Sequence, residues 1–277
     1  MRRALLVILL LISAVHAQVA LAGPARPDPG CAPGWTRVVS HSWWQEKGEP
    51  PPGRHIHLGT CFPLHQALTG SSLTLDITVE LHNDPGLIKW IRGAIGSDVV
   101  AGPYMVNWRC ATICTKTFRM TIPFGGYTGW REFRLSANSS SNVFGDRQYQ
   151  TTRWPARIGS STSGTPRSGS GGWYHGAYQN AYIDEACARR LEQGPIPSSG
   201  LACRAKGDRN RLIVAVDADS HASDPGIELV RTTSRDWRAF TIPGDLPSGF
   251  HRLYVRTEHD FSDGMSAGQH EVWFQVP

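Results

Sequence analysis

Helical periodicity is almost absent from this sequence. Only residues 184–192 place apolar side chains at helical spacing, and Gly194 and Pro195 end that stretch. A helical bundle or an alternating α/β fold needs several amphipathic helices, and this chain offers one short candidate. The lack of helices therefore leaves an all-β fold as the expectation.

Long runs of like charge and familiar catalytic motifs are also missing. Positive residues are scattered along the chain with no run of five, so nucleic-acid binding is not indicated. The motifs G-x-S-x-G, H-E-x-x-H, G-x-G-x-x-G and the P-loop do not occur. These absences favour a binding or structural protein over an enzyme.

The one long apolar run lies at the start of the sequence. Two arginines precede an apolar stretch over residues 4–15, and small residues at 20–22 suit a signal peptidase, as does a second site after Ala17. The run is shorter than the roughly 20 residues that a membrane-spanning helix needs. We therefore expect residues 1–22 to be a signal peptide, no membrane span after cleavage, and a secreted, extracellular protein.

Six cysteines lie beyond the expected cleavage site. An even number in an exported chain predicts disulfides. The rival interpretation, a zinc site, is disfavoured because the C-x3-C spacing has no second pair with histidines at finger-like distance. Sequence alone does not fix the pairing, and the expectation is that nearest neighbours pair: Cys31–Cys61, Cys110–Cys114 and Cys187–Cys203.

Strand patterns occupy most of the remaining sequence. Residues 118–124 alternate apolar and polar side chains, and residues 73–81 do so without a fault. In the second pattern, five apolar side chains share one buried face: Leu73, Leu75, Ile77, Val79 and Leu81. Short strands separated by Gly-, Pro- and Asn-rich turns predict β-sandwich-like domains.

Two segments rich in glycine, serine and proline interrupt the strand patterns. Residues 159–172 are of low complexity and are expected to form a mobile loop. Residues 188–207 are expected to be a linker, because strand patterns restart after them. We therefore expect an N-terminal β-sandwich-like domain over residues 30–187 and a second domain over residues 208–277.

Two neighbouring strand patterns close the sequence. Residues 248–257, read as Ser-Gly-Phe-His-Arg-Leu-Tyr-Val-Arg-Thr, and the pattern of residues 271–276 resemble the last two strands of bacterial immunoglobulin-like modules of secreted proteins. This resemblance implies an immunoglobulin-like fold for residues 208–277 and carries no activity. Three segments of the larger part are similar to uncharacterised secreted bacterial proteins, which imply no mechanism: residues 55–61, 130–135 and 146–149.

Two groups of residues are candidates for metal binding. His55 and His57 form H-x-H, which on a strand turns both rings to one face and suits zinc if a third ligand joins them. The candidates for that third ligand are His41, His65 and His82. Asp217 and Asp219 offer oxygen ligands of the kind that calcium prefers. The alternatives are hydrogen-bonded sheet histidines and aspartates that stabilise a turn.

The segment richest in polar and aromatic residues is 173–182. Its candidate ligand-binding residues are Trp173, Tyr174, His175, Tyr178 and Asn180. On one continuous strand, Trp173 and Tyr178 would face opposite sides. Exposed rings beside small residues would stack on sugars, whereas buried rings would only fill a core. The sequence therefore predicts an extracellular binding or structural protein with carbohydrate, a glycan or cell-surface polymer, as its leading ligand. The alternatives are an extracellular polysaccharide lyase or hydrolase, and a spacer that binds nothing.

Overall fold

The computed structural model describes most of the chain beyond residue 30. The described ranges are 31–32, 35–48, 54–63, 66–82, 87–109, 113–140, 147–164, 167–174, 177–218, 226–262 and 264–277. Within them, strands dominate and a single α-helix, α1 (Glu185–Glu192), is present. The expectation of an all-β protein is confirmed. The predicted signal peptide lies outside the described residues.

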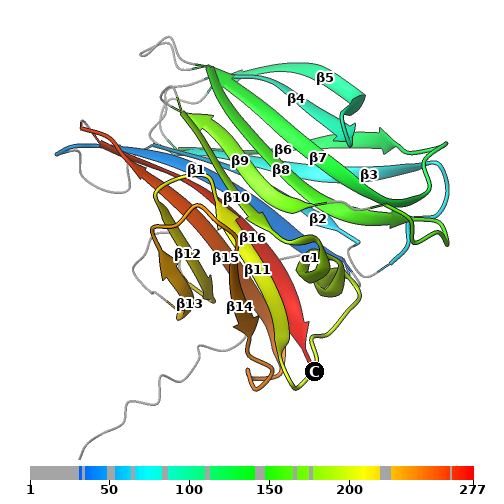
Figure 1. Ribbon diagram of the computed structural model, residues 1–277. Helices are drawn as coiled ribbons and strands as arrows, with labels where there is room; N and C mark the ends of the chain where they lie inside the picture. Colours follow the sequence, from blue (N-terminus) through cyan, green and yellow to red (C-terminus); the bar gives the residue numbers. More distant parts are fainter. Residues whose placement is uncertain are drawn as a thin grey trace, which may run out of the picture.

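The strands form two antiparallel sheets of eight strands that lie face to face (Figure 1). The order in the first sheet is β13 (Ile227–Thr232), β12 (Arg211–Val216), β15 (Gly249–Asp260), β16 (Gly264–Val276), β1 (Thr36–Glu46), β2 (Arg54–Phe62), β3 (Ser72–His82) and β6 (Ile113–Pro123). The order in the second sheet is β14 (Arg238–Ile242), β11 (Leu201–Gly207), β10 (Ala177–Ile183), β9 (Ser168–Tyr174), β8 (Arg147–Ile158), β7 (Gly129–Ser140), β4 (Leu87–Ile95) and β5 (Asp98–Arg109).

Strand β3 shows how the sequence pattern becomes a core. Leu75, Ile77, Val79 and Leu81 are at most 1% exposed and lie between the sheets, as the alternation predicts. The polar residues between them face outward, where Asp76 pairs with Arg119 of β6. Burying four branched side chains in one row stabilises the fold by roughly 1.5–3 kcal/mol each.

The helix α1 lies where the sequence predicts it. Asp184 caps its first turn by accepting a hydrogen bond from the backbone of Cys187 at 3.0 Å, and the acidic Glu185 begins the helix. Cys187 and Leu191 turn toward the core, which anchors the helix beside the sheets. Among the described residues, no helix is long and apolar enough to cross a membrane.

Two of the predicted disulfides, Cys31–Cys61 and Cys187–Cys203, are confirmed. Cys114 is also disulfide-bonded, and its expected partner Cys110 lies outside the described residues. No described cysteine is a free thiol. The bridge from Cys187 to Cys203 ties α1 to β11, and both cysteines are buried in the core.

The sheets do not divide at residues 188–207, where a linker was expected. That range holds the end of α1 and the whole of β11, which pairs with β10 and β14. Strand β1 pairs with β2 on one side and with β16 on the other, so Val38 lies between Thr60 and Val272. Strands from both expected domains thus share two sheets and one hydrophobic core. In the first sheet, β16 from the C-terminal part pairs directly with β1 from the N-terminal part.

The expectation of a loop over residues 159–172 is wrong at its end, because Ser168 to Gly172 belong to β9. The run Ser-Gly-Ser-Gly alternates like any strand. Ser168 and Ser170 are buried between the sheets, and Ser168 Oγ lies 2.7 Å from His270 Nε2 of β16. The intervening glycines face outward. The Ser-Gly composition of this segment is typical of a loop, but its alternation of inward-facing and outward-facing residues has the period of a strand.

Candidate functional site

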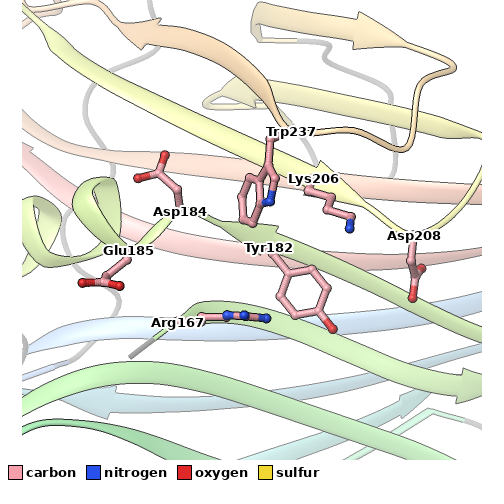
Figure 2. Close-up of a pocket in the computed structure, with 7 residues that line it drawn as sticks. All are labelled: Arg167, Tyr182, Asp184, Glu185, Lys206, Asp208 and Trp237. Atoms are coloured by element: carbon pink, nitrogen blue, oxygen red, sulfur yellow. The ribbon is translucent and has the colours of Figure 1, made fainter. Parts of the chain in front are cut away.

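A hollow of about 490 Å³ opens on the outer face of the second sheet (Figure 2). Strands β10 and β11 form its floor, the start of α1 closes one end, and the loop before β14 rises on one side. Seven residues line it: Arg167, Tyr182, Asp184, Glu185, Lys206, Asp208 and Trp237. Two rings and five charged groups therefore meet in one open cavity.

A row of directly opposed residues crosses four strands under this hollow. Arg153 of β8 is opposite Gly169 of β9, Gly169 is opposite Tyr182 of β10, and Tyr182 is opposite Lys206 of β11. A Cβ on Gly169 would lie 2.7 Å from Cδ1 of Tyr182. The glycine therefore lets the tyrosine ring lie over β9, with the Arg153 guanidinium 5.5 Å from its centroid.

Tyr182 is half-buried, and its burial raises the pKa of the phenol, while the charge of Arg153 acts in the opposite direction. The phenol is therefore neutral at physiological pH and keeps its hydrogen. A neutral hydroxyl both donates and accepts a hydrogen bond, which suits a ligand rich in hydroxyl groups.

Trp237 supplies the second ring of the hollow. It precedes β14 and is partly exposed, with the Arg204 guanidinium 5.8 Å from its ring centroid. In Figure 2, Trp237 lies on one side of Tyr182 and Arg167 on the other. Tyr182 comes from β10 and Trp237 from the loop before β14, and both border the same open space.

The three carboxylates of the hollow are already engaged by the protein. Asp208 accepts hydrogen bonds from the backbone nitrogen of Asn180 at 2.7 Å and from its amide at 2.5 Å. Asp184 caps α1 and also accepts from the backbone nitrogen of Arg204. Glu185 pairs with Arg189 at 2.5 Å. These acids are held in fixed positions and retain further acceptor sites.

Unlike the three acids, the two cations of the hollow have side chains that are not held by ion pairs or hydrogen bonds to other described residues. Lys206 and Arg167 have no ion-pair partner in the part of the chain that the structure describes. Arg167 is exposed and Lys206 is half-buried. Both cations border a cavity that also contains two ring faces and three carboxylates.

The predicted aromatic segment borders this hollow as two strands, β9 and β10, rather than one. Because they pair antiparallel, Trp173 is directly opposite Tyr178 in the register of the two strands. Tyr178 is 60% exposed, and Asn180 holds Asp208 at the rim. His175 and the side chains of Trp173 and Tyr174 lie outside the described residues.

The predicted metal ligands do not converge where the structure describes them. The ring of His57 stacks on that of His41 at 3.8 Å between centroids, which does not aim two nitrogens at one point. Asp217 instead binds the ring of His251 at 2.7 Å and the backbone of Arg252 at 2.8 Å. Among the described residues no three ligands gather. The side chain of His55, and all of Asp219, lie outside them.

Sequence reasoning missed most of the hollow. The sequence predicts a loop around Arg167, a linker around Lys206, and a separate domain that contains Asp208 and Trp237. Their meeting depends on the register between β10 and β11, which joins segments that were expected to be apart. The one signal in the sequence was the alternation of Tyr178, Asn180 and Tyr182, which places all three on one face.

The chain matches no protein-family model, and neither curated proteins nor solved structures gave a match. The function is therefore argued from the geometry of the hollow.

Proposed function

We propose that this protein is a secreted carbohydrate-binding protein and that the hollow bordered by Tyr182 and Trp237 is its binding site. The observation that carries the proposal is the pair of partly exposed rings in one cavity with unpaired donors and fixed acceptors around them. The disulfides support an oxidising, extracellular environment.

Sugars combine apolar ring faces with rims of hydroxyl groups, and the hollow offers a counterpart for each. Tyr182 and Trp237 present flat apolar surface for stacking. Lys206 and Arg167 can donate hydrogen bonds to sugar hydroxyls, and the carboxylate of Asp208 can accept hydrogen bonds from other hydroxyls of the sugar. With five charged groups beside two aromatic rings, the hollow is more polar than most small-ligand sites, which suits a ligand covered with hydroxyl groups.

The test is a glycan array followed by calorimetric titration with the tightest ligand. We expect Trp237→Ala and Tyr182→Ala each to weaken binding by about 1–3 kcal/mol, by analogy with the stacking of bases on aromatic rings. Trp108→Ala is the matched control, because this half-buried tryptophan packs on Phe118 in β6, away from the hollow. Unchanged binding in both site variants, or an array without any ligand, would refute the proposal.

A further inference from the structure

We propose that the ligand is an acidic polysaccharide that extends from the hollow along β10 to Tyr178. This inference rests on the proposed carbohydrate-binding function and adds the charge and the length of the ligand. Its evidence is the set of cations beside the hollow and the exposed ring of Tyr178, which lies on the same face as Tyr182.

The charge of the ligand follows from which groups already have partners. Glu185 pairs with Arg189, and Asp184 and Asp208 accept hydrogen bonds from protein nitrogens. Arg167 and Lys206 have no such partner among the described residues. An anionic group seated between the two cations would complete their hydrogen bonds, and charge-assisted bonds are about twice as strong as neutral ones.

Further cations follow the same strand. Arg153 lies over the ring of Tyr182, and the guanidinium of Arg209 donates through Nε to the backbone carbonyl of Tyr178. Arg209 Nε lies 4.0 Å from the nearer oxygen of Asp208, which Asn180 also binds. Positive groups therefore lie beside the proposed ligand at Tyr182 in the hollow and again at the exposed Tyr178.

The length of the ligand follows from strand geometry. Tyr178, Asn180 and Tyr182 occupy alternate positions of β10 and so share its outer face. Four residues of an antiparallel strand span about 14 Å, so one sugar ring in the hollow does not reach Tyr178. An oligosaccharide does, with Asn180 and Asp208 beneath its middle.

A single-stranded nucleic acid would also bring rings and negative charge. The acids around the hollow favour the saccharide, because Asp184, Glu185 and Asp208 are hydrogen-bond acceptors and a phosphate backbone offers them no donors. The same oxygens accept hydrogen bonds from hydroxyl groups, which a saccharide offers at every unit.

Calorimetric titration of the mature protein with four polymers tests the inference. Polygalacturonate carries carboxylates, dextran sulfate carries sulfates, and fully methyl-esterified pectin and dextran are their uncharged counterparts. We expect one of the charged polymers to bind at least tenfold more tightly than its uncharged counterpart, and the tighter of the two identifies the acidic group. Because exposed charges are screened, that binding should weaken as salt is added.

Three variants locate the binding. Arg167→Gln and Lys206→Gln should each raise the Kd for the preferred polymer about tenfold, the loss expected for one hydrogen bond between charged groups. Lys47→Gln, an exposed cation in the turn after β1, is the control and should change nothing. Tyr178→Ala should weaken binding of the polymer and leave binding of its monosaccharide unchanged.

The outcomes separate the two proposals. If uncharged polymers bind as tightly as charged ones through Trp237, the acidic ligand is refuted and the carbohydrate site stands. If a single-stranded oligonucleotide binds more tightly than every glycan, the ligand class is overturned. If no polysaccharide binds at all, the proposed function falls with the inference.

Discussion

His270 should make this protein sensitive to acid. It lies on β16 between the two sheets, is fully buried, and its Nε2 is 2.7 Å from Ser168 Oγ of β9. Burial, aided by the positive charge of Arg153, lowers the pKa of His270 to about 3. The imidazole is therefore neutral in the native state at any pH at which the protein functions.

The size of the effect follows from the proton that the unfolded chain binds and the native chain does not. An unfolded histidine has a pKa of about 6.5, so below that pH unfolding takes up a proton and stability falls by about 1.4 kcal/mol per pH unit. The loss amounts to about 2 kcal/mol between pH 7.5 and pH 5, and it continues down to the native pKa near 3.

Urea unfolding of the parent and of His270→Gln, each at pH 7.5 and at pH 5, measures this contribution. Glutamine can keep a hydrogen bond to Ser168 and does not titrate. Glu192 and Glu271, whose pKa values burial raises, titrate in both proteins and cancel in the comparison. We expect the variant to lose about 2 kcal/mol less than the parent on acidification. Equal losses in the two proteins would refute the reasoning.

Three further predictions concern the fold. Replacing Cys187 and Cys203 by alanine should lower the free energy of unfolding by about 3 kcal/mol in denaturant titration, given their sequence separation of 16; a change below about 1 kcal/mol would count against this. Gly268→Ala should cost about 2–3 kcal/mol, because the new Cβ collides with the carbonyl oxygen of Gln179 across the sheets, whereas Gly125→Ala in an open turn should be neutral in the same assay. A chain cut after residue 200 should not unfold cooperatively when heated, because it lacks β16; a sharp calorimetric transition would show an independent N-terminal domain.

Local features of the fold could be predicted from the sequence. The alternation in residues 73–81 matches β3, and the short amphipathic stretch matches α1 with Asp184 as its cap. The nearest-neighbour pairing of Cys187 with Cys203 is also correct. Each of these features depends on residues close together in the chain, where period, caps and spacing are sufficient evidence.

Features that depend on distant pairing could not be predicted. The break in composition near residue 200 resembled a linker, yet β11 follows it directly and joins the second sheet. The glycines of β9 resembled a loop, because composition does not show that Tyr182 and Asn180 fill the space above them. The hollow combines Lys206 with Tyr182 only through strand register, which no local pattern encodes.

The pairing of β1 with β16 also sets when the protein can fold. Val38 and Val272 are far apart in the sequence, yet they are direct neighbours in the first sheet. A ribosome must therefore have made the chain as far as β16 before this sheet can close. Long-range strand pairing of this kind slows folding, since loop closure precedes any stabilising contact. Until then the edge of β1 that pairs with β16 stays open, and an unpaired strand edge of this kind favours aggregation.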